Sequence, residues 1–464
     1  MRPAEPLLVY GLGRSGGAVV ARARAAGTPV VWFDARATGP DVDAAIAAGA
    51  ARVADVAEAL RREPPPRTCV AAPGVPYDHP DLVRLRAAGV ETIGEVTWVL
   101  RACPARTVGV TGTAGKGTVT RWVADGLAAA GIDAVAGGNI VPALAAVARP
   151  DATLVIELSS FQLERSPDLR PDVAVVLNLG VDHLDRHGTI AAYHAAKHRL
   201  VASLGPREAF VGNADDPRVS EWLARSAART RRFSLERRAD AWLERASGLL
   251  WLDGDPLLPA ADLRVVGDHQ VGNALAVALA LQACGLGRGP IAEALGAFAG
   301  LPGRYAEVGT LGGVRFLEDS IATRPLAVAA ALRATPGPVV WLAGGVDKGA
   351  DVADLAPLLR DRVVLMLGIG SCGPAFAAAA ARHVPSDVVA EADGRAALRH
   401  AVRRGWRELR DRHGGRGAVL LAPLAASFDQ FRDYADRAAA YRNAVADLAR
   451  DAERDEGVTW TPSS

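Results

Sequence analysis

Lysine is almost absent from this chain of 464 residues, although basic residues as a class are not. Lysine and arginine together number 53, yet the only lysines are Lys116, Lys197 and Lys348. Compositional drift would replace lysine by arginine in this way, because both side chains carry one positive charge. Lysine differs in being a compact ammonium that can lose its proton, whereas the guanidinium of arginine cannot readily do so. Each remaining lysine therefore marks a position where arginine does not serve.

Cysteine is scarce too, and its pattern excludes two classes of site. The chain has four cysteines, scattered without CxxC spacing, at Cys69, Cys103, Cys284 and Cys372. This pattern indicates neither a zinc site nor a disulfide framework. We expect free thiols.

Long apolar runs and an excess of charge of one sign are also missing. No apolar run reaches the roughly 18 residues that a membrane-spanning helix needs, and the opening MRPAEPLLVYGLG leaves no room for the apolar part of a signal peptide. The formal net charge is only +1, which disfavours bulk binding to nucleic acid or anionic lipid. We expect a cytoplasmic monomer that binds neither nucleic acid nor membrane.

Short apolar runs alternate with alanine-rich helical stretches along the chain. PLLVYGLG followed by GAVVARARAAG is one example, and such alternation is typical of α/β proteins with parallel sheets. At roughly 150 residues per domain, the length predicts about three domains. Sequence breaks near Cys103 and Gly300 give the predicted ranges 1–105, 106–301 and 302–464.

Two stretches depart from this alternation. Residues 206–262 contain short strand-like pieces and predict an antiparallel excursion within the middle range. The tail from Asp451, which ends in TPSS, is predicted to fray.

A glycine turn follows the first apolar run. The segment Gly11–Gly16 reads GLGRSG, and Asp34 ends the next apolar run about 20 residues later, as in dinucleotide-binding folds. Glycines allow close approach of a phosphate, and the acid accepts a hydrogen bond from a ribose or base. An ordinary strand-to-helix turn would look the same, so the motif favours a nucleotide without specifying a nicotinamide cofactor.

A second glycine loop carries a stronger signal. The segment Thr107–Thr118, TVGVTGTAGKGT, reads as a strand, a glycine loop and a helix. Backbone N–H groups of such a loop cradle phosphate oxygens, and the lysine, here Lys116, neutralises their charge. An ordinary P-loop follows its lysine with Ser or Thr, whereas here Gly117 intervenes before Thr118. The segment predicts an ATP site, with a purely structural turn as the alternative.

Three further segments place reactive side chains after apolar runs. Glu157 ends the run LVIE, where an open α/β sheet binds ligands, so it is a candidate Mg²⁺ ligand, although a helix cap would look similar. The segment Asn178–Gly188, NLGVDHLDRHG, is either a cation and phosphate site or a solvated loop. Lys197 follows in YHAAK, where the alternative to a functional lysine is a surface cation. Lys348 lies in the glycine-rich AGGVDKGAD, where it suits binding of a carboxylate or phosphate and the alternative is a turn residue.

These motifs, in this order, resemble the Mur ligase family over nearly the whole chain. They include VTGTAGKGT, IELSSFQLE, NLGVDHLDRHG, YHAAK, EDSIATRP and APLAASFDQFRDY, of which ELSSFQLE and DHLDRHG are specific and the glycine motifs alone are not. The resemblance implies a three-domain enzyme of peptidoglycan precursor synthesis, with a Rossmann-like UDP-binding domain, a central P-loop ATP-binding domain and a C-terminal Rossmann-like domain. ATP phosphorylates a carboxylate in this family, and an amine attacks the acyl phosphate. The short first domain is most similar to members that join D-glutamate to UDP-N-acetylmuramoyl-L-alanine.

The resemblance also implies roles for individual residues. For catalysis and up to two Mg²⁺ ions it implies Lys116, Thr118, Glu157, His183 and Lys197, the last as a carbamylated lysine. For ATP it implies Gly112, Thr113, Ala114, Gly115, Lys116, Gly117, Thr118, Asn273, Arg304 and Asp319. For the UDP substrate it implies Leu12, Arg14, Asp34, Arg36, Gly74, Asn139 and Ser159. For glutamate it implies Thr323, Lys348, Ser427, Phe428 and Tyr434.

The chain departs from the family pattern at several of these sites. Ala114 and Gly117 stand where the family has Asn and Ser or Thr, and Gly303 replaces a histidine. Ile321 replaces a lysine near the phosphates and glutamate, and Gln270 replaces the first asparagine of the pattern His-Asn-x-x-Asn, which here reads His269-Gln270-Val271-Gly272-Asn273. These departures keep two alternatives open: the same ligation with L-glutamate and a non-catalytic UDP-sugar-binding relative. The segment GLGRSG with Asp34 keeps open a third, an NAD-dependent dehydrogenase.

Overall fold

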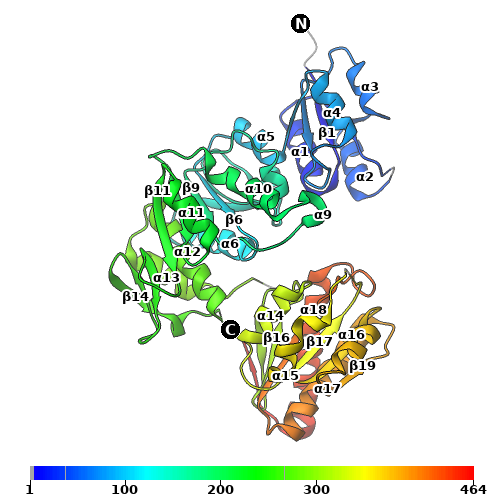
Figure 1. The fold of residues 1–464 in the computed structure, drawn as a ribbon. Helices are drawn as coiled ribbons and strands as arrows, with labels where there is room; N and C mark the ends of the chain where they lie inside the picture. Colours follow the sequence, from blue (N-terminus) through cyan, green and yellow to red (C-terminus); the bar gives the residue numbers. More distant parts are fainter. Residues whose placement is uncertain (1–4, 37, 266, 302, 348, 464) are drawn as a thin grey trace. The chain divides into compact units, whose positions relative to one another are not determined.

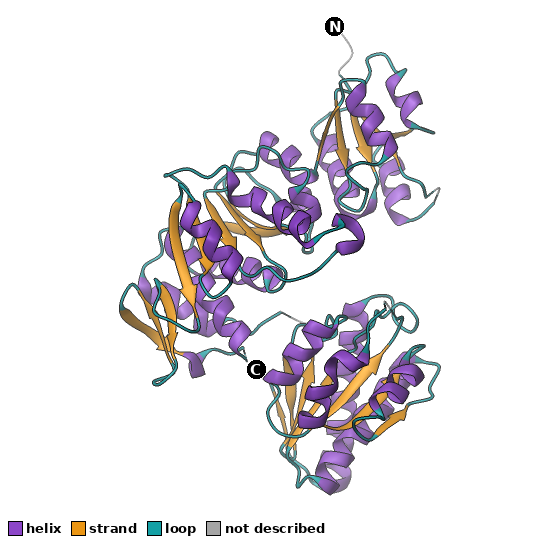
Figure 2. Cartoon of the chain, viewed as in Figure 1, coloured by secondary structure: helices purple, strands orange, loops and turns teal. Residues whose placement is uncertain are grey.

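The computed structural model describes residues 5–36, 38–265, 267–301, 303–347 and 349–463 (Figures 1 and 2). Three separate sheets are flanked by helices, so the predicted α/β class is confirmed. The chain divides into two compact units. The first comprises Met1–Leu263 and Gln270–Phe298, and the second comprises Arg264–His269 and Ala299–Ser464.

The first unit begins with a five-stranded parallel sheet in the order β3-β2-β1-β4-β5. The strand order changes direction beside β1, and the carboxyl ends of strands at such a point form the usual ligand crevice of open α/β sheets. The strands are β1 (Leu7–Tyr10), β2 (Val30–Phe33), β3 (Ala51–Arg52), β4 (Thr68–Ala71) and β5 (Glu91–Ile93). The helices are α1 (Gly13–Ala25), α2 (Pro40–Ala47), α3 (Val56–Leu60), α4 (Pro80–Ala87) and α5 (Glu95–Ala102).

A nine-stranded sheet forms the rest of the first unit, in the order β14-β13-β12-β11-β10-β9-β6-β8-β7. Its strands are β6 (Thr107–Thr111), β7 (Ala134–Gly138), β8 (Thr153–Glu157), β9 (Val173–Val176), β10 (Ala209–Asn213), β11 (Arg229–Ser234), β12 (Ala241–Glu244), β13 (Leu249–Leu252) and β14 (Asp255–Pro259). The helices with it are α6 (Lys116–Ala129), α7 (Leu144–Val147), α8 (Ser160–Leu163), α9 (Leu184–His187), α10 (Ile190–Ala202), α11 (Pro217–Arg225), η1 (Ala260–Asp262), α12 (Asp268–Ala283) and α13 (Arg288–Ala297).

The predicted antiparallel excursion over residues 206–262 is wrong for its first half. β10 pairs in parallel with β9 and β11, and β11 pairs in parallel with β12. Within this stretch, the antiparallel pairs are β12 with β13 and β13 with β14. The reason is α11, which connects β10 to β11 as a crossover, and a crossover returns the chain in the same direction.

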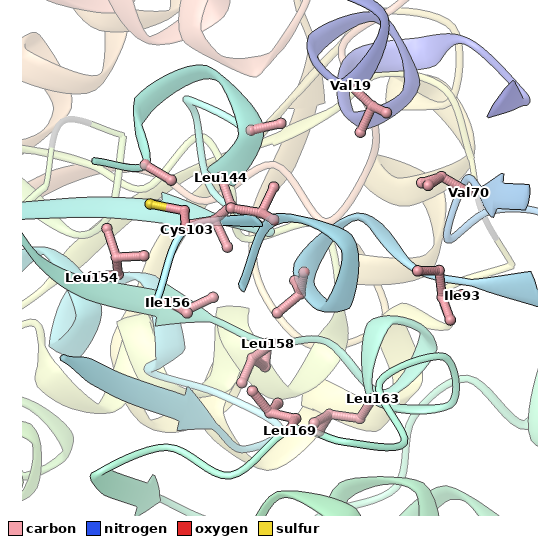
Figure 3. Close-up of a cluster of buried hydrophobic side chains, with 14 of the residues drawn as sticks. Val19, Val70, Ile93, Cys103, Leu144, Leu154, Ile156, Leu158, Leu163 and Leu169 are labelled. Atoms are coloured by element: carbon pink, nitrogen blue, oxygen red, sulfur yellow. The ribbon is translucent and has the colours of Figure 1, made fainter. Parts of the chain in front are cut away.

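One apolar core joins the two sheets of the first unit (Figure 3). Val19 of α1 and Val70 of β4 belong to the same buried cluster as Leu144 of α7 and Ile156 of β8. Each fully buried side chain of this size contributes roughly 1.5–3 kcal/mol relative to exposure. The N-terminal sheet is therefore held against the central sheet by a continuous hydrophobic cluster.

The second unit is built on a seven-stranded sheet in the order β19-β18-β17-β20-β16-β15-β21. It is parallel except for β15 and β21 at one edge. The strands are β15 (Ala306–Leu311), β16 (Val314–Glu318), β17 (Val339–Gly344), β18 (Val363–Ile369), β19 (Ser386–Val388), β20 (Gly417–Leu421) and β21 (Trp460–Pro462). The helices are α14 (Pro325–Ala334), η2 (Val352–Leu355), α15 (Ala356–Arg362), α16 (Gly373–Ala380), α17 (Gly394–Arg412) and α18 (Tyr434–Glu456).

The C-terminal tail is ordered, which corrects the prediction of fraying from Asp451. Helix α18 continues to Glu456, and β21 then pairs with β15. The indole of Trp460 lies over Gly309, where an added Cβ would come within 2.3 Å of the ring. An aromatic anchor and a strand ladder therefore fix the tail, whereas its polar last residues alone predict disorder.

Two further features agree with the sequence. All four cysteines are buried free thiols. In the described part of the chain, no helix has the length and apolar character needed to cross a membrane.

Candidate active site

The phosphate loop connects β6 to α6, as predicted. Gly112 and Gly115 have positive φ angles of 154° and 83°, which favour glycine. A Cβ on Gly115 would also lie 2.6 Å from Oδ1 of Asn273, so the loop packs directly against α12. This contact brings two predicted ATP-binding residues together.

Asn178 organises this loop, a role that the sequence did not reveal. Its Oδ1 accepts hydrogen bonds from the backbone N–H groups of Thr113 (3.1 Å) and Ala114 (2.8 Å). Its Nδ2 donates to the carbonyl of Ala114 (3.2 Å). The ammonium of Lys116 donates to the carbonyl of Thr113 (3.1 Å), which places this predicted phosphate ligand above the same loop.

Glu157 stands at the end of β8 with one carboxylate oxygen unsatisfied. Its Oε1 accepts a hydrogen bond from Nδ2 of Asn139 at 2.7 Å. Its Oε2 is buried and has no hydrogen-bond partner among the described residues. Leaving a buried polar atom unpaired costs about 1–3 kcal/mol, and more for a charged group. The arrangement therefore fits a hard cation such as Mg²⁺, and Thr118, a buried residue in the first turn of α6, has a hydroxyl that could share it.

Lys197 is buried on α10, with 1% of its surface exposed. Its Nζ donates to the carbonyl of Gly112 (2.8 Å) and lies 4.8 Å from the centre of the Tyr193 ring. Burial, reinforced by the positive charge of Lys116, lowers the pKa of Lys197 to about 6. A neutral amine therefore predominates at pH 7, and arginine could not supply one.

The DHLDRHG segment folds against α8 through its histidines. His183 has a positive φ of 53°, and its ring centre lies 4.7 Å from that of Phe161. His187 contacts the hydroxyl of Ser160 through Nε2 (2.9 Å) and a carboxylate oxygen of Glu164 through Nδ1 (3.3 Å). Burial lowers the pKa of His187. We therefore assign His187 to structure, and the role of His183 near a metal stays a prediction.

The predicted metal set does not form a preformed cage. Among the residues that the structure describes, no group of three or more His, Cys, Asp or Glu side chains is placed to hold a metal ion. Ser159, predicted to contact substrate, forms a capping box with Gln162, accepting from its backbone N–H at 3.3 Å. A metal here would need ligands from bound phosphate in addition to Glu157.

Leu12, Asp34 and Arg36, which are three of the residues predicted for the UDP head group, contact one another beyond the ends of β1 and β2. Asp34 accepts from the backbone N–H of Leu12 (2.7 Å) and from Nε and Nη2 of Arg36 (3.0 and 3.1 Å). The Arg36 guanidinium is the main reason that the pKa of Asp34 is lowered to about 2. Asp34 is therefore ionised and already holds Arg36, while Arg14 is exposed in the first turn of α1. Asp34 positions an arginine as well as offering an acceptor.

Two arginines, Arg165 in the turn after α8 and Arg186 in α9, hold the loop that carries Gly74, and sequence reasoning assigned neither of them this role. Arg165, 2% exposed, donates to the carbonyls of Ala72 (2.7 Å) and Val75 (2.5 Å). Arg186 donates to the carbonyl of Val75 as well (3.0 Å). Arg165 directly follows the motif IELSSFQLE and Arg186 lies within DHLDRHG, so proximity to motifs was the available signal.

Replacing Arg165 with Met should weaken binding of the UDP substrate. Methionine fills the space but cannot hold the two carbonyls, so the loop loses its position, and we expect the KM for the UDP substrate to rise about tenfold. The KM for ATP should change little, because the phosphate loop is unaffected. Arg170→Met is a matched control, because Arg170 forms an exposed ion pair with Glu208 (2.9 Å) and exposed ion pairs contribute little to the stability of the fold. Equal KM values in wild type and Arg165→Met would contradict the role.

In the second unit, the structure brings Arg304 and Asp319 within electrostatic reach of each other. Burial and then the adjacent Glu318 raise the pKa of Asp319 to about 7, and the positive charge of Arg304 opposes the shift. Of the predicted glutamate residues, Ser427 is buried, whereas Phe428 and Tyr434 are 69% and 42% exposed. The remaining two are Thr323, which lies half-buried just before α14, and Lys348, which lies outside the described residues.

Comparisons with known proteins show which family the chain resembles. Residues 110–281 match the Mur ligase middle domain. A Thermus thermophilus protein named UDP-N-acetylmuramoylalanine–D-glutamate ligase is 45% identical over 462 residues, covering 98% of this chain and 99% of the relative. The chain belongs to the Mur ligase family. A Deinococcus radiodurans relative of the same name is 43% identical over 446 residues, covering 95% of this Mur ligase and 91% of the relative.

Solved Mur ligase structures share the fold. UDP-N-acetylmuramate–alanine ligase from Thermotoga maritima has a TM-score of 0.60 at 18% identity and covers 96% of this chain and 100% of its own. A pseudomurein peptide ligase type C from Methanothermus fervidus has a TM-score of 0.57 at 15% identity, with 96% and 100% covered. The predicted α/β Mur ligase fold class is confirmed, and the three sheets are consistent with the three-domain architecture of Mur ligases. Family membership implies ATP use, with Mg²⁺ typical.

Proposed function

We propose that this Mur ligase joins D-glutamate to UDP-N-acetylmuramoyl-L-alanine in an ATP-dependent step of peptidoglycan precursor synthesis. Near full-length identity of 45% to a relative named for this reaction supports the choice of substrates. The observation that carries the chemistry is the meeting of three features at one edge of the central sheet. These are the loop with Lys116, the unpaired Oε2 of Glu157 and the buried amine of Lys197.

The reaction needs an activated carboxylate, since a carboxylate is itself a poor acyl donor. An oxygen of the substrate carboxylate attacks the γ-phosphorus of ATP, the bond from that phosphorus to the β,γ-bridging oxygen breaks, and ADP leaves. The amine of glutamate then attacks the acyl phosphate, loses a proton, and expels inorganic phosphate. Such chemistry depends mainly on positioning and on neutralising anions. Lys116 and the loop N–H groups would do this for the phosphates.

We assign Mg²⁺ binding to Oε2 of Glu157 and the hydroxyl of Thr118, and we place His183 near the ion. We also propose that a second Mg²⁺ ion binds at this site. Bound there, Mg²⁺ would neutralise phosphate charge. Lys197 would react as a neutral amine with CO₂: its nitrogen forms a bond to carbon and loses a proton, which leaves an anionic carbamate. That anion would offset the charge of Lys116 and help to organise the metal.

The remaining assignments follow the family pattern. We propose that the UDP substrate is bound by Leu12, Arg14, Asp34, Arg36, Gly74, Asn139 and Ser159. We propose that ATP also contacts Asn273, Arg304 and Asp319, and that glutamate contacts Thr323, Lys348, Ser427, Phe428 and Tyr434. We further propose domains 1–105, 106–301 and 302–464 in a cytoplasmic monomer. Light scattering of the purified protein would check the monomeric state.

Phosphate release with each glutamate enantiomer tests the function. With UDP-N-acetylmuramoyl-L-alanine, ATP and Mg²⁺, we expect release with D-glutamate and at least about tenfold less with L-glutamate at equal concentration. Reactions lacking the UDP substrate serve as the control. A preference for L-glutamate would support the alternative that Ile321 suggests. Binding of the UDP substrate without turnover on either enantiomer would show a non-catalytic relative.

A further inference from the structure

Arg437 is a buried arginine in the first turn of α18, with 1% of its surface exposed. Its Nε donates to Oγ of Ser320 (3.0 Å), and its Nη2 donates to the carbonyls of Ser320 (2.9 Å) and Ala425 (3.1 Å). Its Nη1 donates to the carbonyl of Gly344 (3.3 Å). One guanidinium therefore makes four hydrogen bonds to three separate segments of the chain.

Each of these segments leads into a loop that carries predicted ligand residues. Ser320 lies between Asp319 and Thr323, in the turn after β16. Gly344 ends β17 and opens the glycine-rich loop that follows. Ala425 lies after β20, two residues before Ser427. Arg437 thus ties together the three loops that the sequence assigned to glutamate and to ATP.

The same loops contact one another directly. Val346 and Ala426 exchange both backbone hydrogen bonds (2.8 and 3.0 Å). A Cβ on Gly345 would lie 2.0 Å from the carbonyl oxygen of Ala426 and 3.2 Å from Nη1 of Arg437. Residue 345 has no room for a side chain, so the two loops pack closely against each other. The guanidinium of Arg437 lies beside this contact.

Among the residues that the structure describes, no charged acceptor forms a hydrogen bond with the guanidinium of Arg437. All four hydrogen bonds end on carbonyl or hydroxyl oxygens. Burial lowers the pKa of Arg437 to about 10, so the guanidinium stays protonated at neutral pH. The charges of Asp429 and Glu318 favour this protonated form. A buried cation is an expensive means of joining loops that apolar packing could join, which points to a role in positioning.

We propose that Arg437 is the positioning residue of the glutamate pocket, holding the three loops in the one arrangement that binds the incoming amino acid. This inference rests on the proposed function, because that function defines the pocket. Arg437 does not touch the reacting atoms. Its effect passes through Ser320, Gly344 and Ala425 to the residues beside them.

Kinetics of Arg437→Met and Arg437→Lys test the proposal. For Arg437→Met we expect the KM for glutamate to rise about tenfold or more, since a small loop displacement weakens a polar site strongly. The KM for the UDP substrate should stay within about twofold, because its predicted residues lie in the other unit. Arg437→Lys keeps the charge but reaches fewer acceptors, so its KM should be intermediate. Arg432→Met is the control, because the side chain of Arg432 is exposed and pairs with Asp436 at a long distance of 3.4 Å.

Two additional readouts separate positioning from simple loss of folding. Guanidinium ions added to Arg437→Ala should lower its KM for glutamate, whereas equal concentrations of methylammonium should not. Hydrogen exchange should accelerate at residues 319–323 and 425–428 in Arg437→Met, while the rest of the unit stays protected. This second measurement does not depend on turnover, so it decides the case even if the methionine variant is inactive.

The outcomes that overturn the proposal are distinct. An unchanged KM for glutamate in folded Arg437→Met would overturn it, as would equal changes in both KM values with faster exchange throughout the unit. A wild-type protein that releases no glutamate-dependent phosphate would instead count against the proposed function. In that event, unchanged exchange at the two segments would overturn the positioning role, and faster exchange confined to them would retain it.

Discussion

Replacing Lys197 with arginine should lower kcat about 10³-fold and leave the protein folded. The buried Nζ of Lys197 lies 2.8 Å from the carbonyl of Gly112, and its pKa is lowered to about 6. Arginine remains protonated and cannot form a carbamate. The variant would therefore place a permanent cation beside Lys116 where the proposed mechanism needs an anion. Steady-state phosphate release and circular dichroism would measure the two effects.

Chemical rescue and pH dependence sharpen this prediction. Lys197→Ala should regain part of its activity with bicarbonate or another small carboxylate, which can occupy the position of the carbamate. In the wild type, the amine becomes protonated as the pH falls through about 6, so activity should decline there for enzyme kept without excess CO₂. Arg225→Lys, on an exposed helix surface, is a control for arginine–lysine exchange. Wild-type kcat in Lys197→Arg would refute the carbamate role.

The parts of the site that lie close in sequence were predictable. The phosphate loop follows from a strand, glycines and a lysine within Thr107–Thr118, because phosphate binding needs these elements consecutively. Glu157 was placed correctly at a strand end by the apolar run before it. The scarcity of lysine singled out Lys197, and the structure places its amine in a buried position that lowers its pKa to about 6.

Contacts between distant segments were not predictable from one sequence. Asn178 binds the phosphate loop across 64 and 65 residues, and Arg437 reaches Ser320 across 117. The sequence around Asn178 or Arg437 contains no signal that distinguishes these residues from exposed asparagines and arginines. Strand direction failed for the same reason, since β10 and β11 become parallel only through α11 between them. Buried polar side chains with several backbone partners are the class that needs the fold.

Replacing Glu157 with glutamine should lower kcat about 10³-fold, equivalent to roughly 4 kcal/mol of transition-state stabilisation. Glutamine has nearly the same shape, and its Oε1 can still accept the 2.7 Å hydrogen bond from Asn139. The unpaired oxygen, however, becomes an NH₂ group that cannot bind a cation and carries no charge. The substitution therefore removes the proposed metal ligand while keeping the packing around it.

The dependence on Mg²⁺ distinguishes this explanation from general damage. The Mg²⁺ concentration for half-maximal rate should rise in Glu157→Gln, because a neutral amide binds hard cations more weakly than a carboxylate. Binding of the UDP substrate, measured without ATP, should stay close to the wild-type value. Glu221→Gln, which alters an exposed carboxylate paired with Arg218, should change neither quantity. Wild-type activity of Glu157→Gln at low Mg²⁺ would contradict a metal at the unpaired oxygen. Neutralisation of phosphate charge at this edge of the central sheet would then rest on Lys116 and the N–H groups of the phosphate loop.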